Sequence, residues 1–511
     1  MTDYPAETVL DLLARGADAA PAIGAPSRPS LTYAGLRDLA RRTVADLNRM
    51  GIGRNDRVAI VLPNGPEMAA AFIAIAAGAT TAPLNPGYKA EEFAFYLGDL
   101  NARALVIQQG MDSPARAMAA ERGIPIVELV PGADGPAGAF TLAPPSGLAG
   151  TPAAPGAAAA ADIALVLHTS GTTSRPKIVP LRQVNITASA YHIAGTLRLT
   201  PDDVCLNIMP LFHIHGLIAA TLSSLAAGAS VCCTPGFNAF RFFTWFSEVR
   251  PSWYTAVPTM HQAILGLAGR NEAAIKAARL RFIRSSSSSL PPQVMEELEA
   301  TFGVPVIEAY GMTEAAHQMA SNPLPPGKRY PGAVGLAAGP EIAIMDADGT
   351  ILPAGGLGEV VIRGRNVTAG YENNPAANET AFTHGWFRTG DQGVIDAEGY
   401  LRLTGRLKEL INRGGEKVSP IEVDTVLMDH PAVTQCLTFA VPHKMLGEEV
   451  AAAIVLREGA SATEAELRDF AAQRLAQFKV PRKIVFLAEI PKGATGKLQR
   501  IGLAEKLGLT A

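Results

Sequence analysis

Over residues 30–130, segments whose apolar residues have helical spacing take turns with short apolar runs typical of strands. LTYAGLRDLARRTVADLNRMG (31–51) carries apolar residues at the spacing of an amphipathic helix and ends at Gly51, and the apolar run RVAIVLP (57–63) predicts a strand. The pair repeats in MAAAFIAIAAGATTAPLNP (68–86) and EEFAFYLGDLNARALVIQ (91–108). Strands that alternate with helices predict a largely parallel sheet covered by helices, and hence an α/β fold.

Residues 131–161 interrupt this pattern with a low-complexity run of proline, glycine and alanine, which predicts a surface excursion or linker. PPQVMEELEATFG (291–303) has prolines at its start and Gly303 just past its end, as helices favour. Strand-like runs that end in turn residues recur on both sides of this helix: IALVLH (163–168), SVCCTP (230–235), SWYTAVP (252–258), LRFIRS (280–285) and VPVIEAY (304–310).

From about residue 332 the pattern changes to β-rich runs separated by DADG (346–349) and DAEG (396–399), which predicts antiparallel hairpins. After Arg406 a last segment of about a hundred residues has its own βαβ pattern. We therefore expect a large N-terminal domain over 1–405, with a β-rich subdomain at about 332–405, and a small α+β domain over 406–511.

Composition agrees with a large globular protein. A chain of 511 residues exceeds what one core usually holds, and 48% apolar with 18% charged residues suits a packed interior. The 44 basic and 47 acidic residues give a net charge of −3, and no basic run is present, which disfavours a nucleic-acid partner.

Targeting and cysteine usage predict a cytoplasmic protein without a membrane partner. MTDYPAETVLDLLARG (1–16) lacks the basic flank of a secretory signal, and no run approaches the ~18 apolar residues of a membrane helix. The cysteines lack metal-ligand spacing and are interpreted as structural thiols in a reducing compartment: Cys205, Cys232, Cys233 and Cys436. These patterns do not distinguish a monomer from a homodimer.

The stretch HTSGTTSRPKIVP (168–180) follows a predicted strand and is rich in hydroxyls and glycine. Such a run leaves backbone N–H groups free to surround an anion, and Arg175 and Lys177 add positive charge beside them. It is not a Walker P-loop, because Lys177 follows Gly171 by six residues rather than by one. The residues alone indicate a phosphate-binding loop or, alternatively, an exposed Ser/Thr loop.

Other stretches carry groups that suit a nucleotide. Glu314, at the end of IEAYGMTE, could hold Mg²⁺ on a triphosphate, and Asp391, after the Thr-Gly turn of GWFRTGD, could accept two ribose hydroxyls. GRLKELINRGGEK adds Arg406, and PKGATGKLQR places Lys497 on a glycine-flanked loop. Asp391 and Arg406 could instead be a structural ion pair, and Lys497 could be a solvated lysine.

In order along the chain, TSGTTSRPK, YGMTE, FRTGD, GRLKELINRGGEK and PKGATGK resemble the signature set of the AMP-forming acyl-CoA synthetases and their adenylating relatives. Longer stretches, among them PLFHIHGL, LRFIRSSSSSL and EAYGMTEAAHQMASNPLPP, are similar to the oxalate–CoA ligases of that family. Members join a carboxylate to the α-phosphate of ATP, release pyrophosphate, and transfer the acyl group to the CoA thiol. The resemblance implies an α/β adenylating domain, a mobile C-terminal domain, and ATP, CoA and Mg²⁺.

The resemblance also assigns roles by position. Glu314 would ligate Mg²⁺, Thr313 would touch the α-phosphate, and Lys497 would bridge that phosphate and the attacking carboxylate. The remaining implied nucleotide contacts surround the phosphates, the adenine and the ribose: Thr169, Ser170, Gly171, Thr172, Thr173, Lys177, Glu308, Ala309, Tyr310, Gly311, Asp391 and Arg406.

The second half-reaction is implied in the same way. The C-terminal domain would rotate about the residue that matches the family hinge, Lys408, and would present a CoA-binding loop that contains Gly414, Gly415 and Lys417. Ile178 departs from the family, which usually has glycine after the lysine, and we expect it to stiffen the loop exit.

The positions that resemble the acyl pocket are polar: His213, Ser287 and His317. His317 follows Glu314 by three residues, which would place both on one face of a helix. Hydroxyl and imidazole donors suit a second carboxylate, which is costly to bury unpaired. Oxalate is the acid that the resemblance implies, and malonate is the nearest alternative. His215 and His261 are interpreted as structural residues.

Three functions remain open at this point. The chain could be an ATP-dependent oxalate–CoA ligase, or a CoA ligase for another small or medium acid. It could also be a stand-alone adenylating module that loads a carrier protein, or an adenylate binder without turnover.

Overall fold

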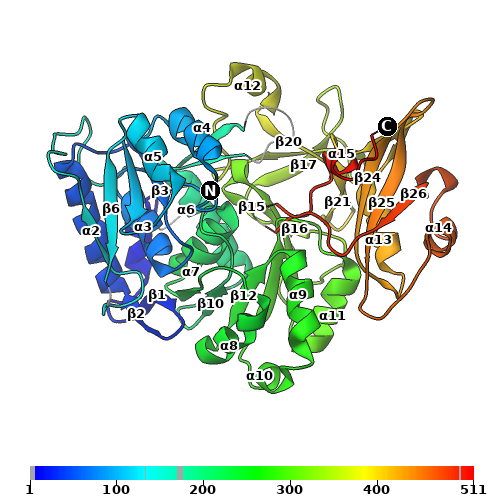
Figure 1. The fold of residues 1–511 in the computed structure, drawn as a ribbon, viewed down its shortest axis with the longest axis horizontal. Helices are drawn as coiled ribbons and strands as arrows, with labels where there is room; N and C mark the ends of the chain where they lie inside the picture. Colours follow the sequence, from blue (N-terminus) through cyan, green and yellow to red (C-terminus); the bar gives the residue numbers. More distant parts are fainter. Residues whose placement is uncertain (1–5, 133, 170–175, 494–495, 511) are drawn as a thin grey trace.

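The computed structural model describes residues 6–132, 134–169, 176–493 and 496–510. The strands of these residues form four sheets, and the first and last lie toward opposite ends of the long axis of the molecule (Figure 1). The predicted α/β fold, with a large N-terminal sheet region and a smaller C-terminal one, is confirmed.

The first sheet has the order β7-β6-β5-β3-β4-β8-β9. It is parallel except at its edges, where β6 pairs with β7 and β8 with β9 in antiparallel fashion. The helix–strand alternation predicted for residues 30–130 is therefore confirmed. Its strands are β3 (Arg57–Val61), β4 (Thr80–Pro83), β5 (Ala104–Gln108), β6 (Ile126–Pro131), β7 (Phe140–Ala143), β8 (Ile163–His168) and β9 (Ile178–Arg182).

The second sheet has the order β16-β15-β14-β13-β12-β10-β11-β1-β2. Its interior strands run parallel, and β14 turns back into antiparallel β15 at one end. Its strands are β1 (Pro21–Ala25), β2 (Arg28–Thr32), β10 (Val204–Asn207), β11 (Ser230–Cys233), β12 (Trp253–Ala256), β13 (Phe282–Ser286), β14 (Val306–Met312), β15 (His317–Ser321) and β16 (Leu336–Ala337).

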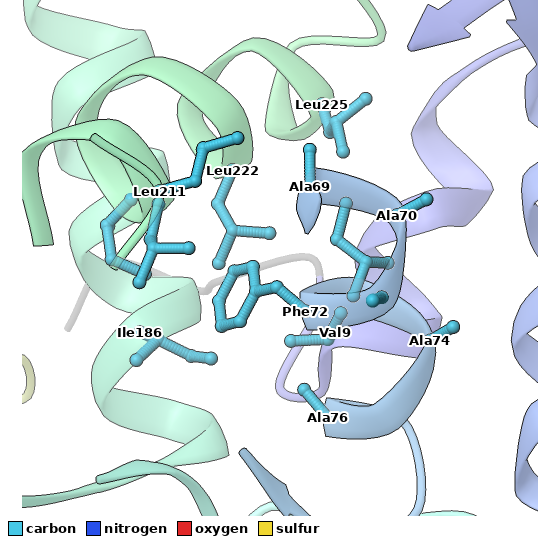
Figure 2. Packing of buried hydrophobic residues seen from close by; sticks show 14 of the residues in the cluster. Val9, Ala69, Ala70, Phe72, Ala74, Ala76, Ile186, Leu211, Leu222 and Leu225 are labelled. Carbon is cyan, nitrogen blue, oxygen red and sulfur yellow. The ribbon is translucent and has the colours of Figure 1, made fainter. Parts of the chain in front are cut away.

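Helix α3 (Pro66–Ala76) lies between these two sheets and contacts β4 of the first and β1 and β11 of the second. A helix that is buried on all sides must be apolar all round, which is what its sequence PEMAAAFIAIA provides after the first turn. Figure 2 shows Phe72 of α3 directed toward Ile186, Leu211 and Leu222, and Phe72 has no exposed surface. This packing joins the two sheets into one core.

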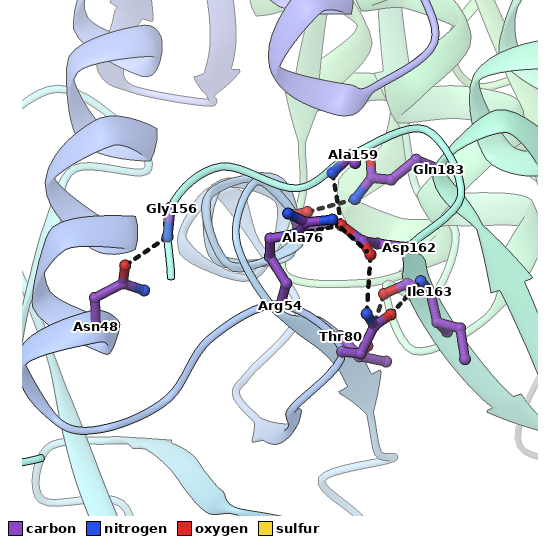
Figure 3. Close-up of polar contacts among 10 residues, drawn as sticks. Asn48, Arg54, Ala76, Thr80, Gly156, Ala159, Asp162, Ile163 and Gln183 are labelled. Carbon is purple, nitrogen blue, oxygen red and sulfur yellow. Dashed lines mark hydrogen bonds and ion pairs between the residues drawn. The ribbon is translucent and has the colours of Figure 1, made fainter. Parts of the chain in front are cut away.

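The linker predicted over 131–161 is partly wrong. Residues 140–143 form β7, and Phe140 is buried because it packs into the core under the sheet edge. The rest is a surface excursion, as expected, but its end is held by polar contacts. Figure 3 shows the Asp162 carboxylate accepting from Arg54 Nε at 2.6 Å and from the Ala159 N–H at 2.6 Å. Asn48 Oδ1 accepts from the Gly156 N–H at 2.7 Å.

The third sheet contains the antiparallel hairpins predicted from about residue 332. The fourth contains the predicted βαβ unit, because β25 and β26 are parallel and are joined through α14. The strands of these two sheets are β17 (Glu341–Met345), β18 (Leu357–Arg363), β19 (Phe382–Thr383), β20 (Trp386–Ile395), β21 (Leu401–Arg406), β22 (Ile411–Arg413), β23 (Glu416–Val418), β24 (Val433–His443), β25 (Gly447–Leu456) and β26 (Lys483–Phe486).

The helices cover the sheet faces, and Gly303 ends α11 in the left-handed conformation, with φ of 68°. In the part of the chain that the structure describes, no helix combines the length and apolar character needed to cross a bilayer. The helices are α1 (Val9–Leu12), η1 (Leu13–Arg15), α2 (Tyr33–Arg49), α3, α4 (Ala90–Leu100), α5 (Pro114–Glu121), α6 (Gln183–Thr196), η2 (His215–Leu222), α7 (Ser223–Ala226), α8 (Ala239–Val249), α9 (Pro258–Ala268), α10 (Glu272–Lys276), α11 (Pro292–Phe302), η3 (Thr313–Ala315), α12 (Pro375–Ala381), α13 (Pro420–Met428), α14 (Glu464–Ala472), η4 (Gln477–Lys479) and α15 (Leu503–Lys506).

Candidate active site

The β8–β9 hairpin carries the ends of the predicted phosphate loop. The Lys177 N–H donates to Thr169 Oγ1 at 3.2 Å, and the Thr169 N–H donates to the Lys177 carbonyl at 2.9 Å. Ile178 follows as the first residue of β9, is buried, and pairs with His168. Ser170, Gly171, Thr172 and Thr173 lie outside the described residues, so their phosphate contacts stay a prediction.

Lys177, Tyr371 and Glu314 form a chain of contacts that leads away from this hairpin. Lys177 Nζ lies 4.3 Å from the centre of the Tyr371 ring, and the Tyr371 hydroxyl donates to Glu314 Oε1 at 2.8 Å. Burial raises the pKa of Glu314, while the Tyr371 hydrogen bond opposes that rise. Tyr371 thereby links the Lys177 ammonium to the Glu314 carboxylate.

Glu314 and His317 do not share a helix face, and that expectation is wrong. Thr313–Ala315 forms one turn of 3₁₀ helix, and the chain then enters β15 through Ala316 and His317, with φ of 48° and 107°. Antiparallel pairing with β14 outcompetes helix continuation here. Non-glycine residues in the left-handed region are strained and concentrate at functional sites.

Strand β14 holds the residues assigned to the adenine. Glu308 is buried, accepts from the Leu290 N–H at 2.9 Å, and has its pKa raised to about 8 by burial. The carbonyl of Ala309 accepts from Ser286 Oγ at 2.8 Å. Tyr310 donates its hydroxyl proton to Asp391.

Asp391 and Arg406 face each other across the β20–β21 pairing, and Arg406 Nε lies 3.2 Å from Asp391 Oδ1. The Asp391 carboxylate is buried, whereas about half of the Arg406 side chain is exposed. Burial raises the pKa of Asp391, although Arg406 and Tyr310 favour its charged form. The two residues thus form an ion pair whose basic member opens toward solvent.

Lys497 reaches this site from the C-terminal part of the chain. Its loop is docked on α9, where Thr259 Oγ1 donates to the Gly496 carbonyl at 2.8 Å. Burial and the nearby Arg406 charge lower the pKa of Lys497 to about 8, while Asp391 and Glu314 oppose that shift. Because these charges act on Lys497, its ammonium lies near Arg406, Asp391 and Glu314, which are predicted to hold the nucleotide.

Ser287, His317 and His213 lie around His215, whose backbone N–H donates to His213 Nδ1 at 3.3 Å, and their assignment to the acid stays a prediction. His215 Nδ1 lies 3.0 Å from Ser287 Oγ, and its ring centre lies 5.1 Å from that of His317. Burial lowers the pKa of His213 to about 3 and lowers the pKa values of His215 and His317 well below the usual range. The three imidazoles are therefore neutral, and we name the cluster of His213, His215, Ser287 and His317 the histidine pocket, after the acyl pocket that the resemblance assigns to it.

His215 is the residue that sequence reasoning assigned to structure alone. Its Nε2 lies 2.6 Å from Thr255 Oγ1, so both ring nitrogens have hydroxyl partners. His215 also begins η2, a π-helical segment, and such segments are frequent at functional sites. The spacing of the two histidines in PLFHIHGL was the available signal. His261 is buried beside Tyr254, away from the pocket contacts, in agreement with a structural role.

A cavity of about 860 Å³ lies between the N-terminal sheets and the C-terminal segment, and Glu308, Lys417 and Lys497 all line it. This volume lies in the usual range for small-molecule sites. Gly414 and Gly415 form the β22–β23 turn, outside the cavity lining, and Lys408 lies in the turn between β21 and β22. Of the three assigned CoA residues, Lys417 alone lines this cavity.

Models of known protein families match two parts of the chain. A model of the AMP-binding enzyme family matches residues 13–372, and a model of the AMP-binding enzyme C-terminal domain matches residues 422–497. The chain belongs to the AMP-binding enzyme family. The second match contains Lys497 as its last residue, so this AMP-binding enzyme carries the family's C-terminal unit through to the lysine in the site.

Named relatives of this AMP-binding enzyme extend over nearly its whole length. The oxalate–CoA ligase of Arabidopsis thaliana is 45% identical over 94% of each chain, and that of Saccharomyces cerevisiae is 45% identical over 88% of this chain and 87% of its own. The ATP-bound crystal structure of MatB from Rhodopseudomonas palustris is 30% identical, covers 98% of each chain, and superposes with a TM-score of 0.87.

Proposed function

We propose that this AMP-binding enzyme is an ATP-dependent, AMP-forming oxalate–CoA ligase that makes oxalyl-AMP and then oxalyl-CoA with release of pyrophosphate. The observation that carries the proposal is the histidine pocket beside Lys497, in a chain 45% identical to two proteins named oxalate–CoA ligase. ATP, CoA and oxalate are the small-molecule partners, and a cytoplasmic location fits four buried free thiols.

The pocket chemistry favours a short acid with a second anionic group. His213 and His317 offer ring nitrogens and Ser287, which His215 holds, offers a hydroxyl, whereas a fatty or aromatic tail would require an apolar lining. A buried carboxylate is stabilised when such donors satisfy its oxygens. Malonate has the same two charges on a longer chain, so it is the nearest alternative substrate.

In the adenylation step, an oxygen of the acid attacks the α-phosphorus and the pyrophosphate leaves. Lys497 carries the mobile positive charge that would neutralise both reactants, and Thr313 would donate to the α-phosphate. Transfer of this kind depends mainly on positioning and charge neutralisation, and one well-placed donor is worth about 10² to 10³ in rate. The exposed side of Arg406, together with Asp391, would hold the ribose.

The phosphates would lie between the β8–β9 hairpin and Glu314, with Thr169 and Lys177 at the hairpin ends and Ser170, Gly171, Thr172 and Thr173 between them. Adenine would lie along Glu308, Ala309, Tyr310 and Gly311. Glu314 suits Mg²⁺ because this ion is commonly held by one carboxylate with substrate phosphates and waters as its other ligands. Mg²⁺, when bound, would neutralise phosphate charge, while Tyr371 orients the Glu314 carboxylate.

In the second step the CoA sulfur attacks the acyl carbon and AMP leaves. Rotation about Lys408 would withdraw Lys497 and bring Gly414 and Gly415 toward the bound adenylate, with Lys417 beside the CoA path. Such alternation is a conformational mechanism, so each half-reaction should respond to its own set of substitutions.

The test is a pyrophosphate-release assay with a panel of acids, with and without CoA, together with direct detection of the thioester. The expected result is oxalate- and CoA-dependent formation of oxalyl-CoA. Preference for malonate would move the assignment to that acid, and adenylate that accumulates without thioester would favour a carrier-loading enzyme. His317→Leu should raise the KM for oxalate at least about tenfold, and unchanged oxalate kinetics would contradict the pocket assignment.

A further inference from the structure

Arg284 lies in the centre of the nine-stranded sheet, beneath the histidine pocket. Its β13 position is in register with Thr255 of β12, and its side chain has no exposed surface. Residues in register on neighbouring parallel strands project from the same face of a sheet. Since Thr255 lies 2.6 Å from His215 Nε2, the guanidinium and His215 occupy the same face.

The guanidinium is also tied to the strand that carries His317. Arg284 Nη2 donates to Gln318 Oε1 at 3.3 Å, and Gln318 directly follows His317 in β15. The Gln318 amide is itself fixed, because its Nε2 donates to Thr196 Oγ1 and to the Ala338 carbonyl at 3.1 Å each. Arg284 is therefore held between the two sides of the pocket.

The guanidinium is under-satisfied for a buried cation. Its Nε and Nη1 atoms are buried and have no hydrogen-bond partner within the described ranges, and no carboxylate there contributes to its ionisation. Buried charges are normally paired, because removing them from water is costly. Arg281, three residues earlier, shows the usual solution, since its Nη1 lies 2.5 Å from Asp203 Oδ2.

The charge persists at neutral pH, because burial lowers the pKa of Arg284 only to about 9. His215 and His317 are neutral there, and the Arg284 charge contributes to lowering the pKa of both. His317 Nδ1 is buried without a partner within the described ranges, so it can orient an anion without balancing its charge. A second anionic group on the substrate would supply the missing countercharge.

We propose that Arg284 is a specificity-determining residue that selects acids with two anionic groups by balancing the distal carboxylate through the His215–His317 layer. The inference rests on the proposed activation of a short diacid. Arg284 acts through the imidazoles and through Gln318, and is thus a positioning residue. A monocarboxylate would leave the guanidinium unbalanced and is disfavoured for that reason.

The experiment compares Arg284→Gln, which removes the charge, with Arg284→Lys, which keeps it. Arg281→Gln is the control for loss of a nearby arginine outside the pocket. For each purified full-length variant, the KM for ATP and the kcat/KM for oxalate and for glyoxylate, a monoanion of similar size, are measured by thioester formation.

Arg284→Gln should raise the KM for oxalate at least about tenfold and reduce the oxalate-to-glyoxylate preference by a similar factor, while the KM for ATP stays within about twofold. Arg284→Lys should recover most of the preference, and Arg281→Gln should keep the wild-type preference. Equal losses for both acids in Arg284→Gln, or a lysine variant as unselective as the glutamine variant, would overturn the inference.

If Arg284→Gln does not fold, Arg284→Lys decides the question, because loss of the oxalate preference in this charged and folded variant would contradict the inference. Failure of the proposed function gives a different result. If the wild-type enzyme prefers glyoxylate to oxalate, Arg284 is not a selector of diacids, although ATP-dependent ligation stands. If no acid yields a thioester, the ligase assignment fails. The role of Arg284 is then tested by binding: the rise in Tm caused by oxalate is compared with the rise caused by glyoxylate, in wild type and in Arg284→Lys.

Discussion

The carbonyl oxygen of His317 occupies the space that a β carbon on Gly311 would need, at 1.9 Å from its ideal position. Across the β14–β15 hairpin Gly311 pairs with Gln318 and Met312 pairs with His317, and the register shifts between Tyr310 and Gly311. Glycine is therefore required at 311 for close approach of the two strands, in addition to the nucleotide role that the resemblance implies. The geometry of His317 depends on this missing side chain.

Gly311→Ala should push the His317 backbone away from β14 and lower kcat/KM for oxalate at least about tenfold, with a fall in Tm. Gly195→Ala is the matched control, because Gly195 lies in α6 with open space around its β-carbon position. That control should leave the kinetics unchanged and stabilise the fold by up to about 1 kcal/mol. Wild-type kinetics in Gly311→Ala would show that His317 does not need this placement.

Lys497→Ala should slow pyrophosphate release about 10²- to 10³-fold and leave thioester formation from supplied oxalyl-AMP much less affected. The pKa of Lys497 is about 8, so the charged form is present below pH 8 and is lost above it. The kcat/KM for ATP should therefore fall as pH rises through about 8. Lys497→Arg should remove this alkaline decline from its residual activity, because arginine stays charged. Adenylation at the normal rate in Lys497→Ala would contradict the mechanism.

Tyr371→Phe removes the hydrogen bond to Glu314 and keeps the ring beneath Lys177. The Mg²⁺ concentration for half-maximal pyrophosphate release should rise roughly three- to tenfold, because a hydrogen bond to a charged group contributes about 1.5–3 kcal/mol and water replaces part of it. Tyr371→Leu also removes the ring contact and should add a rise in the KM for ATP. Identical Mg²⁺ titrations for wild type and Tyr371→Phe would count against the role of Tyr371 in orienting Glu314.

Glu308 should make stability depend on pH. Its folded pKa of about 8 exceeds the ordinary value of 4.5, so the native state binds more protons than the unfolded state between these values. Its contribution is fully present below pH 4.5 and is lost as pH rises through about 8. Glu308→Gln keeps the acceptor for the Leu290 N–H without the ionisation, so its Tm should decline less than that of wild type from pH 5 to pH 8. Parallel Tm profiles would contradict a buried, protonated Glu308.

The sequence pattern predicted the layers of this fold because its elements are strongly periodic or uniformly apolar. The helix–strand pairs of residues 30–130, the hairpins around DADG and DAEG, and the C-terminal βαβ unit all appear where apolar spacing placed them. The pattern missed β7 because its few apolar residues lie within a run of proline, glycine and alanine. It also assigned Glu314 and His317 to a helix, because strand pairing across β14–β15 is a long-range effect that local spacing does not contain.

The site residues proposed from the sequence are those that local motifs marked, and their roles stay predictions. Arg284 lies in no such motif, and for His215 only the histidine spacing in PLFHIHGL was available, because the contacts of both residues depend on how β12, β13 and η2 pack together. For Arg284 one signal was available in the sequence. Arg284 is a charged residue inside the otherwise apolar or small run FIRSS (282–286), in a segment predicted to be a strand, and charged residues are rarely buried without a partner.

Glu314 lies in the short turn after β14 and His317 begins β15 directly after it, so the proposed nucleotide end and the proposed acid end of the site share one piece of backbone. A substitution in that turn that admits a new acid would therefore also disturb the proposed binding of Mg²⁺ and the triphosphate at Glu314. Laboratory redesign for longer diacids should therefore begin at Thr255 of β12 and at Ser287, which follows β13. Substitutions there can change the size of the histidine pocket without moving the Glu314 carboxylate.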